Sequence, residues 1–213
     1  MSFTDLPAHQ LLERFAANDP TPGGGSASAF AGSLAAALAR MVAGLTVGKK
    51  GYEEASQEAA KLGQQAEGLQ GKLARAVAED AASFEAVMTA MALPKATDEE
   101  KEARKLAMQA GLKGATLAPM GVAQACLDTA RLAHRLLGIG NKNACTDAAV
   151  AVLLACAGAE GALLNAAINL GSIKDEAWVE EQREQCDALW EALDAMRSDL
   201  WPQVRAHGLD IAR

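Results

Sequence analysis

The spacing of apolar residues along the chain predicts long α-helices. Between Glu53 and Met91, apolar residues recur every three or four positions, which is the period of one buried helix face. Thr97 followed by Glu100 is a capping-box pair that opens another long helix. Segments of helical character, separated by proline, glycine and asparagine, extend over residues 7–17, 26–47, 53–91, 97–137, 146–170 and 175–200.

Two details of these helices are predicted by local sequence. Ser26 follows a proline and three glycines, so we expect it to cap helix 26–47. Pro119 lies inside helix 97–137 and is expected to bend it. No linker and no internal repeat divides the chain, so residues 1–213 are predicted to form one helical domain.

The predicted fold class is all-α, an antiparallel bundle of five or six long helices. Alanine, the strongest helix former, occurs 49 times, whereas isoleucine, which favours strands, occurs four times. The two longest helices, of roughly 40 residues, would each be ~60 Å long. One chain can hardly cover helices of that length, so we expect a homodimer.

Composition and charge exclude several classes of function. A net charge of −7 and only eight aromatic residues leave little that could bind phosphates or stack bases, so no nucleic acid partner is expected. Residues 26–48 and 146–170 are apolar enough to suggest membrane spans, but Arg40 in the first and Glu160 in the second favour buried helices of a soluble bundle. The four cysteines are scattered without a CxxC motif, which is typical of a reduced, cytoplasmic protein.

Asp80 is the first candidate for catalysis. The series Ala66, Leu73, Asp80 and Val87 advances by seven residues, so Asp80 projects from the helix face that should be buried. A carboxylate there costs free energy unless it is paired, hydrogen-bonded or protonated. It can be a structural residue bonded to a neighbouring helix, or a general acid and base whose pKa is raised by an apolar wall. The pattern alone leaves both possibilities open.

A glycine-rich loop is the second candidate. Pro22, Gly23, Gly24, Gly25 and Ser26 lead directly into a helix of small residues. Glycines let backbone N–H groups approach a ligand, and the start of a helix favours anions or polar oxygens. No strand precedes the loop and no Lys-Ser/Thr pair follows it, so it is neither a P-loop nor a dinucleotide fingerprint. The alternative is a turn before a helix that packs closely.

Other polar residues also have two interpretations. Asn165 and Asn169 lie four apart on one face of a buried helix, where they can lock a neighbouring helix or bind the polar edge of a heterocycle. Asp147 can cap its helix, and Lys49 and Lys50 can be a solvated pair favoured by the helix dipole. The three histidines lie on different elements and no HExxH motif is present, so no metal site is expected.

Four stretches of the chain, taken together, resemble the folate cyclodeaminase/cyclohydrolase family. They are PTPGGGSASA (20–29), MVAGLTVGKKGY (41–52), EDAASFEAVMTAMALPKATDEEK (79–101) and TDAAVAVLLACAGAEGALLNAAINL (146–170). The resemblance covers nearly the whole chain and implies an all-helical, dimeric protein. The formiminotransferase half of the bifunctional members is missing. Glu160 stands where we would expect an apolar residue.

The resemblance also implies roles for the candidate residues. Asp80 matches the aspartate that is catalytic in the cyclodeaminases. The family's glycine loop, paired basic residues and late helix imply a set of substrate-binding residues: Pro22, Gly23, Gly24, Gly25, Ser26, Lys49, Lys50, Asp147, Asn165 and Asn169.

The function implied by the resemblance is an enzymatic step of folate one-carbon metabolism. We expect a methenyltetrahydrofolate cyclohydrolase, which adds water to 5,10-methenyltetrahydrofolate and gives 10-formyltetrahydrofolate. The alternatives are a formiminotetrahydrofolate cyclodeaminase, which releases ammonia, and a non-catalytic helical dimer that binds folate. Neither reaction needs a metal or a redox cofactor, so none is expected, and the partner is a small folate.

Overall fold

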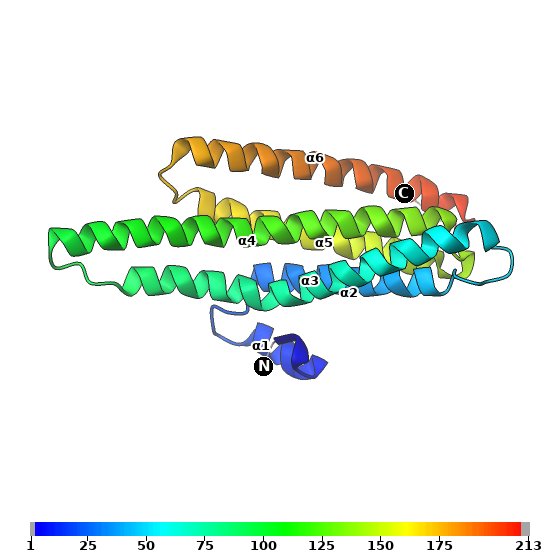
Figure 1. Ribbon diagram of the computed structural model, residues 1–213, viewed down its shortest axis with the longest axis horizontal. Helices are drawn as coiled ribbons and strands as arrows, with labels where there is room; N and C mark the ends of the chain where they lie inside the picture. Colours follow the sequence, from blue (N-terminus) through cyan, green and yellow to red (C-terminus); the bar gives the residue numbers. More distant parts are fainter. Residues whose placement is uncertain (1–2, 210–213) are drawn as a thin grey trace.

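The computed structural model describes residues 3–209, and this part of the chain contains helices and no strand (Figure 1). The prediction of an all-α fold is therefore confirmed. Six α-helices follow one another: α1 (Ala8–Ala16), α2 (Gly24–Gly44), α3 (Glu53–Ala92), α4 (Asp98–Ile139), α5 (Cys145–Leu170) and α6 (Glu176–Ala206). Short 3₁₀ helices cover Phe3–Asp5 and Lys142–Ala144.

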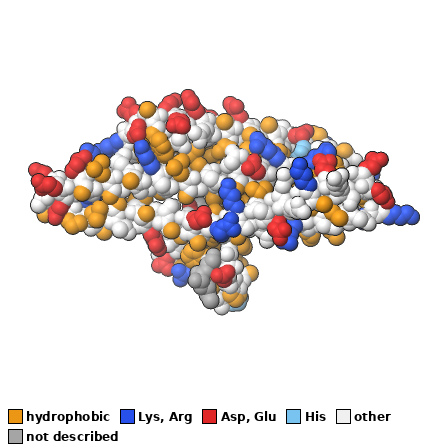
Figure 2. Space-filling model, viewed as in Figure 1, with side chains coloured by type: hydrophobic (Ala, Val, Ile, Leu, Met, Phe, Trp, Pro, Cys, Tyr) orange, Lys and Arg blue, Asp and Glu red, His pale blue; other side chains and the backbone are white. Residues whose placement is uncertain are grey.

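Helices α2, α3, α4 and α5 form an antiparallel four-helix bundle, in which each helix packs on the next and α5 packs on α2. It follows that α3 and α5 run parallel to each other. Helix α6 lies along α4 and α5, whereas α1 projects from the side of the bundle (Figure 1). Acidic side chains gather along the outer edge of α6 (Figure 2), in keeping with the negative net charge of the chain.

Local sequence predicts one helix start correctly and another wrongly. Thr97 and Glu100 form the expected capping box, with the Glu100 N–H donating to Thr97 Oγ1 at 3.2 Å and the Thr97 N–H donating to Glu100 Oε2 at 3.1 Å. Ser26 does not cap α2, because the helix begins at Gly24 and Gly23 is its N-cap. Helix α4 runs without interruption through Pro119.

Small residues at the centre of the bundle bring α2, α4 and α5 close together. Ala29, Ala36, Ala155 and Ala159 are fully buried. At Gly158 an added Cβ would lie 2.8 Å from the Ser28 carbonyl oxygen of α2. This packing also explains the apolarity of two segments, Gly24–Gly44 and Lys142–Leu170, which are long and apolar enough to cross a membrane but have about half of their residues buried inside the protein.

The close packing predicts opposite effects for two glycine substitutions. Gly158→Ala should destabilise the protein by about 1–3 kcal/mol, because the new methyl group meets the α2 backbone. Gly68→Ala should stabilise it by about 0.5–1 kcal/mol, because Gly68 lies in the middle of α3 with open space around it and alanine favours the helix. Urea unfolding measures both changes. Equal effects of the two substitutions would contradict this account of the core.

Candidate active site

A cavity of about 420 Å³ lies at one corner of the four-helix bundle. Helices α3, α4 and α5 continue beyond the start of α2 at Gly24, so this corner holds no helix and a pocket takes its place (Figure 1). The walls come from the loop before α2 and from the three continuing helices. The pocket is lined by Pro20, Thr21, Gly23, Gly24, Gly25, Asp80, Ser83, Phe84, Val87, Ala115, Asn165, Ile168, Asn169 and Ser172.

The carboxylate of Asp80 lies against the first turn of α2. Ser26 Oγ is 2.9 Å from Asp80 Oδ2 and also 2.9 Å from the Val77 carbonyl oxygen, and the Ser26 backbone N–H donates to the same carboxylate. Gly25 is needed for this approach, since a Cβ at that position would collide with Asp80 Oδ1. The loop glycine and the buried serine therefore fix where the carboxylate sits.

Two opposing effects set the pKa of Asp80. Burial is the larger effect and raises the pKa, because the apolar surroundings disfavour the charged form. The hydroxyl and the backbone N–H of Ser26 act in the other direction, because they stabilise the ionised carboxylate. The net result is a pKa above the ordinary value for aspartate, so Asp80 can accept and return a proton more readily than a solvent-exposed aspartate.

The two asparagines on α5 present hydrogen-bond acceptors to the pocket. Asn165 Nδ2 donates to the Gly161 carbonyl oxygen at 2.8 Å. Asn169 Nδ2 donates to the carbonyl oxygens of Ala115 at 2.8 Å and of Asn165 at 3.1 Å. Because both amide nitrogens are engaged by the backbone, the Oδ1 atoms are left to accept hydrogen bonds from a ligand. The bond from Asn169 to Ala115 ties α5 to α4, so Asn169 also has a structural role.

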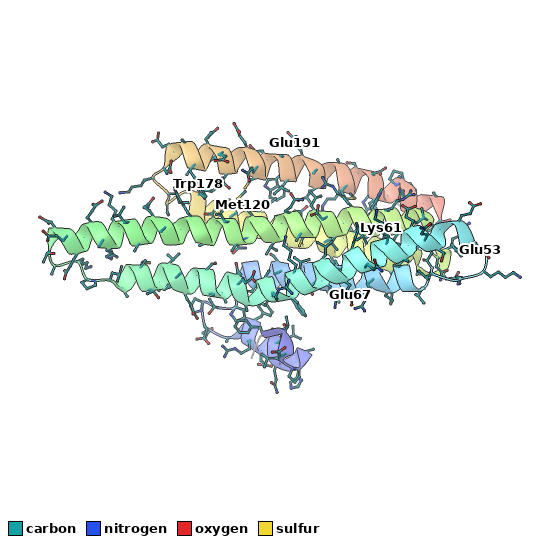
Figure 3. The ribbon with its side chains drawn as sticks, viewed as in Figure 1. Glu53, Lys61, Glu67, Met120, Trp178 and Glu191 are labelled. Atoms are coloured by element: carbon teal, nitrogen blue, oxygen red, sulfur yellow. The ribbon has the colours of Figure 1, made fainter. Side chains whose placement is uncertain are left out.

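The structure brings some of the predicted site residues together and separates others. Gly23, Gly24, Gly25, Asp80, Asn165 and Asn169 line one pocket. Pro22 and Ser26 are buried behind it and do not line it. Helix α2 separates Lys49 and Lys50 from this pocket by ~30 Å, since they follow its far end. Glu53 marks that end of the bundle in Figure 3.

Asp147 also lies far from the pocket and does not cap its helix. It belongs to the first turn of α5, whose N-cap is Ala144 and which has no side-chain cap hydrogen bond. Eighteen residues separate it from Asn165, which corresponds to ~27 Å along the helix. Glu160 forms an ion pair with Arg197 of α6: Nη2 donates to Oε2 at 2.8 Å and Nε lies 2.7 Å from Oε1.

Sequence reasoning missed the apolar side of the pocket. Phe84 and Val87 belong to the periodic apolar stripe of α3 and were expected to be buried in the core. Phe84 is instead 38% exposed, because α2 begins too late to cover it, and it lines the pocket together with Ile168 of α5. Their positions in the sequence, one and two helical turns after Asp80, indicate that both side chains lie close to Asp80 on the same face of α3.

Residues 7–188 match the family described as formiminotransferase-cyclodeaminase. A methenyltetrahydrofolate cyclohydrolase of Methylorubrum extorquens is 39% identical over 92% of this chain and 94% of its own length. The chain belongs to the formiminotransferase-cyclodeaminase family.

Other members of this family share the helical domain in different contexts. The formimidoyltransferase-cyclodeaminase of Sus scrofa is 31% identical over 88% of this chain, which matches only 35% of that longer enzyme. The crystal structure of a formiminotetrahydrofolate cyclodeaminase from Thermotoga maritima superimposes with a TM-score of 0.86 at 29% identity, over 97% of this chain and 99% of that one. The chain therefore corresponds to the cyclodeaminase-like portion of the bifunctional members.

The raised pKa of Asp80 predicts how stability depends on pH. A pKa higher in the folded state than in the unfolded state means that ionisation of Asp80 destabilises the fold. Asp80→Asn should therefore be at least as stable as the parent protein at neutral pH. This advantage should shrink as the pH falls toward about 3.9, the ordinary pKa of aspartate, because the parent carboxyl becomes protonated.

Thermal unfolding of both proteins across this pH range measures the difference. A variant that is markedly less stable than the parent at neutral pH would contradict this assignment and make Asp80 a structural residue.

Proposed function

We propose that this protein is a methenyltetrahydrofolate cyclohydrolase. The observation that carries the proposal is the position of Asp80, the one ionisable side chain among those that line the pocket, with a pKa raised by burial. The extensive similarity to the cyclohydrolase of Methylorubrum extorquens supports the same reaction. The substrate would be 5,10-methenyltetrahydrofolate, whose one-carbon bridge carries a delocalised positive charge.

The proposed reaction opens the bridge by addition of water. Ionised Asp80 removes a proton from water as the oxygen bonds to the methenyl carbon between N5 and N10. The same group then delivers the proton to N5 while the bond between that carbon and N5 breaks, and the hydroxyl of the adduct releases its own proton, which leaves a formyl group on N10. Overall, the cation and water give 10-formyltetrahydrofolate and one released proton. The carboxylate also stabilises the positive charge of the bound substrate.

The other pocket residues hold the substrate or the carboxylate in this proposal. The Oδ1 atoms of Asn165 and Asn169 accept hydrogen bonds from N–H groups on the pterin edge. Gly23 and Gly24 allow close approach to the start of α2. Ser26 orients Asp80 from behind rather than touching the substrate. The reaction draws on no metal or redox cofactor.

A cyclodeaminase is the second candidate, favoured by the similarity to the cyclodeaminase of Thermotoga maritima. In that reaction N10 attacks the formimino carbon on N5, and ammonia leaves after receiving a proton. Asp80 would move the proton from N10 to the departing nitrogen, so the same carboxylate serves both chemistries. A non-catalytic folate-binding protein is the remaining alternative.

We further propose that the protein is a cytoplasmic homodimer. Large apolar side chains are exposed on the outer face of the neighbouring helices α2 and α5, among them Leu34, Met41, Val150 and Leu164. Apolar surface of this extent is covered in most soluble proteins by a partner. The absence of paired cysteines agrees with a reducing compartment.

The activity test uses purified protein with each of the two folate substrates. The parent should consume 5,10-methenyltetrahydrofolate, followed by loss of its near-ultraviolet absorbance, faster than it releases ammonia from 5-formiminotetrahydrofolate. Asp80→Asn should lower turnover by on the order of 10² to 10⁴, because general acid–base catalysis is lost. Glu79→Gln is the matched control on the neighbouring, exposed position of α3 and should keep parental activity.

Three outcomes would overturn parts of this proposal. Faster turnover of the formimino substrate would make the protein a cyclodeaminase. An active Asp80→Asn variant would remove the aspartate from the mechanism. A parent protein that binds folate but converts neither substrate would favour the non-catalytic alternative.

The proposed homodimer can be tested separately from the activity. Light scattering should give a mass near twice the 22.0 kDa of one chain, and Leu34→Glu should reduce it to that of the monomer by placing a charge on the α2 face. Leu106→Glu is the control, because Leu106 is also exposed but lies on α4, outside this face. A parent protein that is monomeric at micromolar concentration would refute the dimer.

A further inference from the structure

Helices α3 and α4 continue past the pocket as a two-helix hairpin (Figure 1). Helix α2 begins at Gly24, and its next residue, Gly25, lies against Asp80. Helix α5 ends at Leu170, also short of the tip of the hairpin. The face of α3 that α2 covers further back is therefore left open by α2 and α5 over the last turns of α3.

Apolar side chains continue the pocket wall along this open face. Phe84, Val87 and Met91 follow Asp80 at steps of four, three and four residues, so all four lie on one face of α3. Phe84 and Val87 line the pocket, and Met91 beyond them is 47% exposed. Eleven residues separate Asp80 from Met91, which corresponds to ~16 Å along the helix. This face, formed by Phe84, Val87 and Met91, is called the α3 track below.

Arg104 of α4 lies at the far end of the α3 track. Its Nε donates to the Met91 carbonyl oxygen at 3.1 Å, so the side chain crosses from α4 to the last turn of α3. Closer to the pocket, a Cβ added at Gly111 would lie 3.4 Å from the Val87 Cα, and Ala115 lines the pocket itself. Arg104, Gly111 and Ala115 are spaced by seven and four residues and share one side of α4. This side of α4 therefore follows the α3 track from the pocket to Arg104.

Arg104 has no acidic partner at this end of the hairpin. The acidic side chains of the first turns of α4 are engaged by other groups: Asp98 by Lys101, Glu102 by Lys105, Glu99 by the Thr97 side chain and Glu100 by the Thr97 N–H. Within residues 3–209, no carboxylate forms an ion pair with Arg104, and its hydrogen bond to Met91 uses Nε. The two terminal nitrogens of the guanidinium are therefore left to bind a ligand.

The proposed substrate carries opposite charges at its two ends. The methenyl bridge is a cation, and the glutamate beyond the benzoyl ring carries carboxylates. From the bridge to the outer carboxylate the molecule extends up to roughly 13 Å, the reach of about four extended residues. A contact at each end adds about 3 Å, so the substrate can span the α3 track. Asp80 at one end and Arg104 at the other match its order of charges, and the apolar side chains between them suit a benzoyl ring.

We propose that the α3 track binds the p-aminobenzoylglutamate part of the substrate and that Arg104 binds its carboxylates. The inference rests on the proposed function, because the occupant is the folate of that reaction. The benzoyl ring packs on Phe84 and Met91, and the guanidinium donates hydrogen bonds to the glutamate. Arg104 thereby fixes the direction in which the folate lies, with its one-carbon bridge beside Asp80.

The test compares a substrate that has the glutamate with one that lacks it. 5,10-Methenyltetrahydropteroate has the same bridge and the same benzoyl ring as the folate but no glutamate. The parent protein should have a KM about fivefold lower for the folate than for the pteroate. Arg104→Gln keeps an N–H group that can donate to the Met91 carbonyl oxygen but loses the charge. It should raise the KM for the folate about fivefold and leave the KM for the pteroate unchanged, with a smaller effect at high salt.

Two charge variants are the controls for Arg104. Arg104→Lys keeps a positive charge and should restore most of the preference for the folate. Lys105→Gln removes the neighbouring exposed charge, which is paired with Glu102, and should behave like the parent protein. If Arg104→Gln raises both KM values equally, or changes neither, Arg104 only stabilises the end of α3 and the proposal is wrong.

A second pair of variants tests the path of the substrate. Met91→Glu places a carboxylate on the α3 track and should raise the KM for the folate more than that for the pteroate, because it repels the glutamate. Thr89→Glu places the same charge on the opposite, exposed side of α3 and should leave both KM values unchanged. Equal effects of the two substitutions would contradict the proposed path.

Binding without turnover separates the α3 track from the proposed reaction. Calorimetry measures the affinity of each variant for 5-formyltetrahydrofolate and for its pteroate counterpart. A parent protein that converts neither substrate, but whose preference for the folate analogue is lost in Arg104→Gln, would remove the reaction and keep the track. A parent protein that is active with both substrates and has no preference for the folate would keep the reaction and remove the track. Failure to bind either analogue, together with failure to convert either substrate, would overturn both.

Discussion

The contact between the Asp80 carboxylate and the first turn of α2 is the constraint on which the site depends. A half-buried carboxylate costs free energy, and the Ser26 hydroxyl and backbone N–H offset part of that cost. The carboxylate can come this close only because position 25 has no side chain. The glycine loop thus makes room for an acidic group as much as for a ligand.

That contact exists because α2 begins at Gly24, part-way along the bundle, rather than at the end of its neighbours. The neighbouring helices α3, α4 and α5 run past Gly24, so the bundle has four helices at its middle and three at the pocket. The stripe of α3 that would pack against a longer α2 is left open there, which exposes Phe84 beside Asp80. One structural feature, the position of the start of α2, therefore creates the cavity, its apolar wall and its helix N-terminus.

The sequence allowed the fold class and several pocket residues to be predicted, for identifiable reasons. Helical periodicity is a local property, and it placed Asp80 on the inner face of α3 without knowledge of its partners. The start of α2 was misjudged because Ser26 is a favourable N-cap by residue type, whereas the structure uses its hydroxyl to bind Asp80. The Glu160–Arg197 pair joins two helices and could not be inferred from either segment alone. The length of α2 separates Lys49 from the pocket, and this distance follows from the bounds of the helix rather than from the residue types.

The central claim is that the pKa of Asp80 lies above the ordinary value for aspartate because its burial outweighs its hydrogen bonds. The most direct measurement is the pH titration of the Asp80 carboxyl carbon by NMR, in protein labelled with ¹³C at aspartate and assigned by comparison with Asp80→Asn. The account predicts a midpoint clearly above the ordinary aspartate pKa of about 3.9, rising further in Ser26→Ala because a bond to the ionised form is lost. A midpoint at or below the ordinary value would contradict it.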